Sequence, residues 1–330
     1  MGFLFFLLIK LNNFDYEKNR KLYMKLKFVS ASPATIYYAW QVEVMINNFI
    51  SMGIPLDSIN IISWTEGEIP LEWQKLSKHY PANFFFYKDT RQTKHYISSI
   101  RPNILKQHFE KFPELEKDAI LYHDCDIVFT KPIDWEQFLQ DDKWYGSDCR
   151  WYIGHSYILS KGEDILTKMC EIVNIPKHII EHNELNSIGA QYLMKGINSL
   201  YWDEVEIDSE RLYKEITDMN NIKKSENPSY HELQIWTSDM WAVLWGGWKM
   251  GKETICHPDL EFSWATSTEA DWNRLNIYHN AGVTSAEEGL FYKANYMNRL
   301  PYNENLNIKE GTASKKYWEI IQETAKKSVL

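Results

Sequence analysis

The chain has 330 residues, of which 44% are hydrophobic and 15% aromatic, and a formal net charge of −9 at pH 7. This length and composition allow a large hydrophobic core, in one large domain or two ordinary ones. The acidic balance, without a long run of Lys and Arg, argues against a nucleic acid as partner. The 14 Trp and 20 Tyr suit either a core or a groove lined with rings for flat ligands, and composition does not separate the two.

The cysteines are scattered without C-x-x-C spacing, which is typical of free thiols in a reducing compartment; they are Cys125, Cys149, Cys170 and Cys256. No Asn-x-Ser/Thr acceptor site occurs, because the nearest match, 227–229, contains a proline. Both observations favour a cytoplasmic location.

Residues 1–23 differ from the rest of the chain. The apolar run at their start is far shorter than the roughly 20 residues of a membrane span, so we expect no transmembrane segment. The basic region and small-residue cleavage site of a signal peptide are missing, and position 6 is Phe6, where a myristoylation motif needs Ser or Thr. Polar residues follow, and Met24 opens a clean strand. We predict that residues 1–23 are an appendage or precede the natural start at Met24.

From Lys25 the apolar spacing alternates between strand and helix periods. The predicted strands are 26–32, 58–64, 82–89 and 118–130, and the predicted helices between them are 37–53 and 99–112. Such alternation predicts an α/β fold with a mostly parallel sheet flanked by helices, whose ligands bind at the carboxyl ends of the strands. We predict one domain over residues 24–300, followed by a helical tail over residues 301–330.

The last predicted strand is interrupted by Asp124-Cys125-Asp126. On a strand the two carboxylates would project to one face, where burial of like charges is costly unless a cation lies between them. In a turn they would be ordinary solvated residues. Carboxylate oxygens suit Mg²⁺ or Mn²⁺, which take further ligands from water and substrate phosphates. The apolar residues before the pair and the β-branched run after it favour a metal site.

A strand ending in D-x-D after an N-terminal βαβ region resembles the nucleotide-sugar-dependent glycosyltransferases of the GT-A fold. The H-x-x-G of His279 to Gly282 is similar to the motif with which glycogenin-like and related transferases supply a histidine as third metal ligand. Lys293 follows it as a phosphate-contacting lysine does in those families, although the next Pro-Trp is missing. Segments 37–53, 99–105 and 186–196 resemble the peptidyl serine galactosyltransferases, the hydroxyproline arabinosyltransferases and their viral and microbial relatives. The resemblance spans about residues 25–295.

The resemblance implies transfer of a monosaccharide from a UDP-sugar to a hydroxyl acceptor on a glycan or glycoprotein. It implies Asp124, Asp126 and His279 as metal ligands, although a histidine alone is more often structural. A mixed nitrogen and oxygen site favours Mn²⁺, with Mg²⁺ as the alternative. A cation on the diphosphate would neutralise charge that develops on the leaving group.

The resemblance also implies contacts with the donor. Ser30, Ala31 and Ser32 end the first strand, where this fold places uracil and ribose, although small residues suit any βα turn. Arg101, at the start of a helix, is expected to reach the diphosphate or to lie on the helix surface. Asp124 is expected to contact the donor as well.

The resemblance places segment 186–194 as a loop under the sugar. Gly189 permits close approach of the backbone, and Gln191 offers a donor and an acceptor to sugar hydroxyls. The alternative is a helix N-terminus capped by Asn186 or Ser187.

Asp239 lies between Trp236 and Trp241 in a strongly apolar segment. In an inverting enzyme it is the candidate base that takes the proton of the acceptor. In a retaining enzyme no base is needed, and Asp239 would bind a hydroxyl of donor or acceptor. The alternative is a helix N-cap.

Two other classes of protein compete with this reading. Nucleotidyltransferases and phosphohydrolases also place acidic pairs on strands, but usually with a third carboxylate or a Gly-rich phosphate loop, and neither G-x-x-x-x-G-K-[ST] nor G-x-G-x-x-G occurs here. A sugar-binding module without catalysis would need no uridine pocket, so UDP binding separates it from the enzyme.

Overall fold

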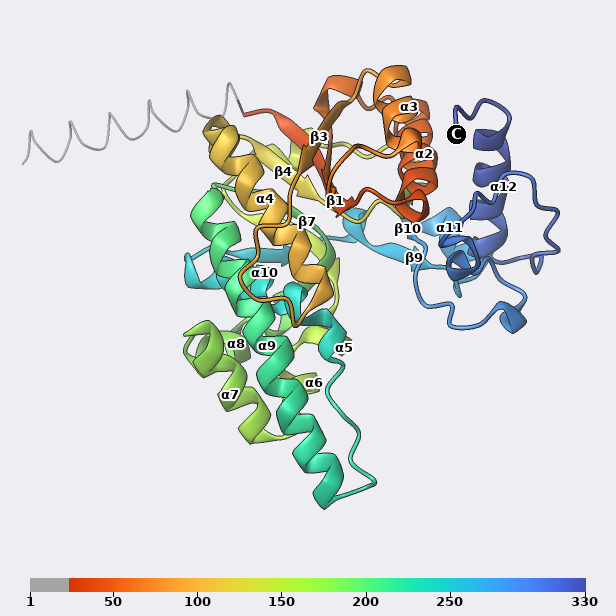
Figure 1. The fold of residues 1–330 in the computed structure, drawn as a ribbon. Helices are drawn as coiled ribbons and strands as arrows, with labels where there is room; N and C mark the ends of the chain where they lie inside the picture. The colour runs from red at the N-terminus through yellow and green to blue at the C-terminus, as the bar shows by residue number, and fades with distance from the viewer. Residues whose placement is uncertain (1–23) are drawn as a thin grey trace, which may run out of the picture.

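The computed structural model describes residues 24–330, so the predicted appendage of residues 1–23 lies outside the described part of the chain. The first half alternates strands and helices as the sequence predicts (Figure 1). In chain order these are β1 (Leu26–Pro33), α2 (Ile36–Ser51), β2 (Ile59–Trp64), α3 (Leu71–His79), β3 (Asn83–Tyr87), α4 (Ile100–Lys111) and β4 (Ala119–Tyr122). Helix α3 was not predicted.

The main sheet has seven strands in the order β3-β2-β1-β4-β7-β6-β8. Its second half contains β6 (Trp144–Asp148), β7 (Ile188–Lys195) and β8 (Thr254–Cys256). Strand β7 runs antiparallel to both of its neighbours, whereas all other pairs in this sheet are parallel. The predicted α/β fold, a mostly parallel sheet flanked by helices in a single domain, is therefore confirmed.

A second sheet of three strands has the order β5-β10-β9. It consists of β5 (Ile127–Phe129), β9 (Phe262–Trp264) and β10 (Ile277–His279). The strand predicted over 118–130 is thus two strands, β4 and β5, which belong to different sheets and are separated by a turn. Helix α2 packs against β5 and so joins the two sheets.

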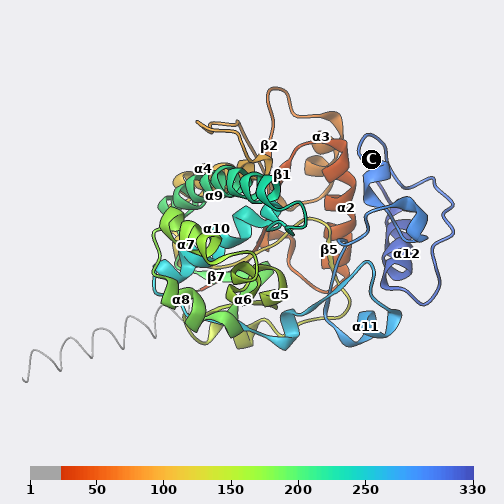
Figure 2. The same cartoon turned by 90° about the horizontal axis from the view of Figure 1, so that it is seen from below.

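Helices cover both faces of the main sheet (Figures 1 and 2). Helix α4 packs with α9 (Ser199–Glu226) and α10 (Ser238–Lys249) on one face, and α2 and α3 lie on the other. Right-handed crossover connections explain this division. The chain adds β2 and β3 on one side of β1 and then returns to add β4 on the other side, so α4 lies on the opposite face from α2 and α3. The remaining helices are α5 (Arg150–Ile153), α6 (His155–Leu159), α7 (Glu163–Val173), α8 (Lys177–His182), α11 (Glu269–Arg274) and α12 (Ala313–Ala325).

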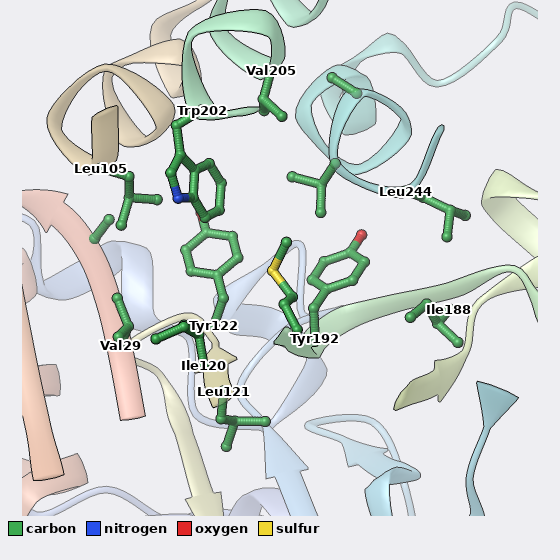
Figure 3. Close-up of a cluster of buried hydrophobic side chains, with 14 of the residues drawn as sticks. Val29, Leu105, Ile120, Leu121, Tyr122, Ile188, Tyr192, Trp202, Val205 and Leu244 are labelled. Atoms are coloured by element: carbon green, nitrogen blue, oxygen red, sulfur yellow. The ribbon is translucent and has the colours of Figure 1, made fainter. Parts of the chain in front are cut away.

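All four residues of the central strand β4 are buried, as expected for a strand covered on both faces. Figure 3 shows Tyr122 and Tyr192 projecting from the sheet toward Trp202 and Val205 of α9, with Leu244 of α10 beside them. Many of the aromatic residues belong to this core; its fully buried tryptophans include Trp73, Trp144, Trp202, Trp241 and Trp245.

The predicted tail over 301–330 contains α12, which packs on α2 and α11. Tyr317 and Ile321 of α12 join Trp40 and Val44 of α2 in a second hydrophobic cluster. Within residues 24–330, no helix has both the length and the apolar character needed to cross a membrane.

Candidate active site

The acidic pair lies in the turn that leads from the main sheet into the small one. Strand β4 ends at Tyr122, and β5 begins at Ile127, so Asp124 and Asp126 lie between two buried strands at the carboxyl end of β4. Strand β5 pairs antiparallel with β10, which sets His279 opposite Ile127. The backbone N–H of Asn280 donates to the carbonyl of Asp126 at 3.0 Å. Strand pairing therefore delivers His279 to the acidic turn.

Asp124, Asp126 and His279 form a cluster with metal-ligand chemistry. The Nε2 atom of His279 lies 3.2 Å from Asp126 Oδ1 and 3.6 Å from Asp124 Oδ2. One ligand atom from each residue lies within 4.8 Å of the others. Asp126 is 4% exposed and His279 8% exposed, so these two side chains are largely removed from water, whereas Asp124 is partly exposed. An imidazole with two carboxylates fits Mn²⁺ or Mg²⁺, with remaining positions open to water and phosphate.

Two cationic side chains neutralise the carboxylates. Lys293, at the start of a 3-10 turn, forms an ion pair with Asp126. Arg101 of α4 bridges two acids, with one guanidinium nitrogen 2.6 Å from Asp124 and the other paired with Asp239. Three carboxylates and two cations carry a formal charge of −1, which a divalent cation would change to +1. A bound divalent cation would therefore turn this cluster into a site that attracts a diphosphate.

The pKa shifts follow from these pairs. Burial alone would raise the pKa of Asp126, but Lys293 and His279 hold it well below the usual range of a carboxyl group. Burial alone would lower the pKa of Lys293, but the charge of Asp126 raises it above its usual range. Both groups are therefore ionised at neutral pH. Burial lowers the pKa of the neighbouring His123 to about 4, so its imidazole is neutral.

Two cavities of about 500 Å³ each open on either side of the cluster. The first, here called the β1 cavity, lies beyond the end of β1 and is lined by Ala31, Ser32, Tyr38, Trp64 and Asp126, among others. The second, the β7 cavity, is lined by Tyr96, Ala190, Trp236, Asp239, Trp264 and His279, among others. Both cavities share walls formed by Ile97, Ser98, Arg101, Asp124 and Lys293. The charged cluster thus lies where the two cavities meet.

The structure brings most of the predicted donor contacts to these cavities. Ala31 and Ser32 line the β1 cavity, and the hydroxyl of Ser32 has no hydrogen-bond partner among residues 24–330. Ser30 is buried within β1 and lines neither cavity. Arg101, Asp124 and Lys293 line both.

Asp239 lies in the first turn of α10 and faces the β7 cavity. Its Oδ1 accepts a hydrogen bond from the Tyr96 hydroxyl at 2.6 Å, and its Oδ2 pairs with Arg101. The N-cap position belongs to Thr237, whose side chain makes no capping hydrogen bond. The alternative of Asp239 as an N-cap is therefore wrong.

Gln191 and Gly189 do not reach either cavity. The segment predicted as a loop or a helix start is strand β7, and Gln191 is fully buried in it. Its Nε2 donates to the carbonyl of Leu260 at 2.7 Å, so the side chain ties β7 to the neighbouring segment. A Cβ on Gly189 would lie 2.7 Å from Met240, so glycine is needed there for packing. The residue of this segment that lines the β7 cavity is Ala190, whose φ of +63° is rare for a residue with a side chain.

The segment between β3 and α4 also shapes the site, and no local pattern in its residues predicts this. Tyr96, Ile97 and Ser98 come from this segment and line the β7 cavity. Glu210 of α9 anchors it, accepting from the backbone N–H of His95 at 2.8 Å and from the hydroxyl of Ser99 at 2.5 Å. The anchor is a long-range contact, which local periodicity does not reveal.

Comparison of the sequence with protein-family models gave no match, and comparison with curated proteins gave none either. Among solved structures, the chain is similar to the bifunctional glycosyltransferase WbbM, with a TM-score of 0.45 and 10% identity over 93% of this chain and 52% of that one. The chain therefore spans about half the length of WbbM.

Two further solved structures are similar. One is a glycosyltransferase involved in glycosylation of the major capsid of PBCV-1, with a TM-score of 0.37 and 14% identity over 80% of this chain and 96% of that one. The other is the galactosyltransferase LgtC in complex with donor and acceptor sugar analogs, with a TM-score of 0.40 and 8% identity over 90% and 95% of the two chains. These scores lie below 0.5, so the function proposed below rests on the geometry of the site.

Proposed function

We propose that this chain is a metal-dependent glycosyltransferase of the GT-A class, which moves a monosaccharide from a UDP-sugar to a hydroxyl acceptor on a glycan or glycoprotein. One observation carries the proposal. Asp124, Asp126 and His279 converge from two sheets onto one point between two cavities at the carboxyl end of β4. A donor with a diphosphate between a nucleoside and a sugar has the same three-part layout.

The β1 cavity suits the nucleoside. Trp64 and Tyr38 offer ring faces for a flat base, and Ser32 offers an unpartnered hydroxyl. Ala31 leaves room for close approach at the end of β1. The β7 cavity then receives the sugar, since it is reached from the β1 cavity past the charged cluster.

Asp124, Asp126 and His279 would hold a divalent cation, Mn²⁺ by the mixed donor set, with Mg²⁺ as the alternative. Such a cation supplies charge neutralisation for the leaving diphosphate. Lys293 and Arg101 stay cationic beside it, and each can exchange a carboxylate partner for a phosphate oxygen. The planar guanidinium of Arg101 already spans two acids, a geometry that also suits two phosphate oxygens.

Asp239 is proposed to bind a hydroxyl of donor or acceptor and to orient Arg101. Both of its oxygens already accept a bond, one from Tyr96 and one from Arg101. Each carboxylate oxygen has a second lone pair, so both oxygens of Asp239 can still accept from a sugar hydroxyl. Its position between Tyr96 and Arg101 supports a binding role, as in a retaining enzyme, over that of the base of an inverting one.

The proposal is tested by donor hydrolysis. Purified protein is incubated with UDP-glucose, UDP-galactose, UDP-xylose, UDP-arabinose and UDP-N-acetylglucosamine, with Mn²⁺ or with EDTA, and released UDP is measured. We expect release from at least one donor with Mn²⁺ and none with EDTA. His279→Ala should abolish release, while His257→Ala, a histidine outside both cavities, should not. Equal release with EDTA would contradict metal dependence, and the absence of both UDP binding and release from every donor would favour a sugar-binding module.

A further inference from the structure

A third cavity of about 650 Å³ adjoins the β7 cavity. It is here called the distal groove and is lined by Tyr157, Lys161, Tyr230, Gln234 and others. Tyr213 and Trp236 line both the distal groove and the β7 cavity. A ligand that fills the β7 cavity can therefore extend past Trp236 into the distal groove.

The junction between the two spaces is built from rings. Trp236 is 58% exposed, although it is among the most apolar side chains. Its ring lies nearly parallel to that of Tyr152, with an interplanar angle of 15°. Tyr213 stacks on Tyr96, whose hydroxyl binds Asp239. Exposed apolar surface of this kind, beside a polar site, marks a place that a ligand covers.

Both lysines that line the distal groove already contact partners within it. The ammonium of Lys161 lies 5.2 Å from the centre of the Tyr157 ring. Lys224 donates to the carbonyl of Tyr230 at 2.9 Å and lies 4.0 Å from Glu232. What remains for a ligand is ring faces, hydroxyls and an amide, which match the apolar faces and hydroxyl edges of neutral sugars.

The backbone around the distal groove does not favour a peptide. Its lining residues come from α6 and the turn after it, from α9 and from the segment 230–236, so no strand edge among residues 24–330 faces it. An extended peptide usually gains its affinity by adding a strand to such an edge. A glycan needs only the rings and polar groups that are present.

We propose that the distal groove and Trp236 form an acceptor subsite for a neutral glycan chain of several sugars. The terminal sugar lies in the β7 cavity beside Asp239, and the preceding sugars stack on Trp236 and run along Tyr230 and Tyr157. This inference rests on the proposed function, because it names the acceptor that the transferase uses.

The test is binding of neutral glycans to the full chain saturated with Mn²⁺ and UDP. The probes are glucan, galactan, mannan, xylan and arabinan series, each from the monosaccharide to the hexasaccharide. Binding of UDP is measured first, so a failure of the donor site is recognised before the glycans are added. We expect at least one series in which affinity rises about tenfold or more with length, since each stacked ring adds favourable contact.

Single substitutions then test which side chains bind the glycan. Trp236→Ala should lower affinity for the long glycan by about thirtyfold and remove most of the length dependence, whereas Trp236→Phe should keep most of it. Tyr230→Ala should weaken only the longer members of the series. Ile222→Ala, which removes an exposed apolar side chain of α9 outside the distal groove, should bind like the unchanged protein.

Two results would overturn the proposal while UDP binding stays intact. One is affinity that does not depend on length in any series. The other is a Trp236→Ala variant that binds long glycans as well as Ile222→Ala does. Loss of UDP binding in the unchanged protein would instead contradict the proposed function itself.

Discussion

Buried carboxylates in this protein are stabilised in two different ways. Glu43 of α2 is fully buried and accepts hydrogen bonds from the Tyr302 hydroxyl at 2.5 Å, the Ser328 hydroxyl at 2.7 Å and the backbone N–H of Val329 at 2.8 Å. These three partners are neutral and come from the C-terminal segment, and the Tyr80 hydroxyl also donates to Glu43, at 3.5 Å. Asp126 is nearly as buried, but its partners are Lys293 and His279, and it lines the β1 cavity.

The two sets of partners correspond to a structural role for Glu43 and a functional role for Asp126. The hydrogen bonds to Glu43 fasten residues 302–329 to α2, and Glu43 lines neither the β1 cavity nor the β7 cavity. Asp126 instead lies beside Lys293, His279 and Asp124 at the wall of the β1 cavity. A metal ion or a phosphate that enters this cavity can therefore replace one of its partners. Burial of a carboxylate alone therefore does not indicate a functional site.

Asp126→Asn should have the largest effect. Loss of this ligand should lower the rate of donor hydrolysis about a thousandfold or more, because metal stabilisation of the leaving group contributes several kcal/mol. Asn is preferred to Ala, since it leaves an oxygen for Lys293 to contact. Asp118→Asn, at the other end of β4, is the matched control and should hydrolyse normally. Full activity of folded Asp126→Asn would remove the metal site from the mechanism.

Glu43→Ala should change stability and spare the site. Removing the carboxylate leaves two hydroxyls and one backbone N–H without their acceptor, so the free energy of unfolding should fall by about 3 to 4 kcal/mol. Urea unfolding measures this loss, and UDP affinity of the folded fraction should be unchanged. A Glu43→Ala protein of unchanged stability but weaker UDP binding would contradict the structural role of Glu43.

Asp208 of α9 provides a third case, in which burial dominates. Burial raises the pKa of Asp208 from 3.8 to about 6. The folded state therefore binds this proton more tightly than the unfolded state, so the contribution of this carboxyl to stability is fully present below about pH 4 and is lost as pH rises through about 6. The shift of about two pKa units corresponds to roughly 2 to 3 kcal/mol.

Asp208→Asn should remove that part of the pH dependence and stabilise the protein at pH 7. Urea unfolding of both proteins at several pH values between 4 and 7 checks this. An identical pH dependence in the two proteins would show that the buried carboxyl does not titrate as described.

Asp239→Asn should have the smallest effect. Asn can still accept from Tyr96 but loses the ion pair with Arg101, so hydrolysis and transfer should fall about tenfold. Steady-state rates at saturating donor measure this. A fall of about a thousandfold would instead assign Asp239 as the base of an inverting reaction.

The sequence predicted the parts of the site that are local or carry a motif. The strands and helices over 26–112, apart from α3, follow from apolar periodicity, and Asp124 and Asp126 stand out because they interrupt an apolar run. His279 and Lys293 were found through resemblance, since nothing local distinguishes a ligand histidine from a structural one. The structure shows why His279 lies at the site: β10 pairs with β5, and this pairing places His279 beside the acidic turn.

Other parts of the site depend on contacts that no local pattern encodes. The resemblance predicts a loop over 186–194, and the alternative is a helix start, because a short buried strand and a helix start give similar apolar runs. As β7 lies between β4 and β6, the side chain of Gln191 points into the packed interior. Tyr96 and its neighbours reach the β7 cavity only because Glu210, far along the chain, anchors their backbone.

The central claim is that Asp124, Asp126 and His279 bind a divalent cation that in turn binds the diphosphate of a UDP-sugar. Calorimetric titration of UDP into the protein, with Mn²⁺ and with EDTA, tests it most directly. The account predicts micromolar affinity with Mn²⁺, none with EDTA, and none for Asp126→Asn with Mn²⁺. UDP binding of equal strength with EDTA, or no binding of UDP in either condition, would contradict it.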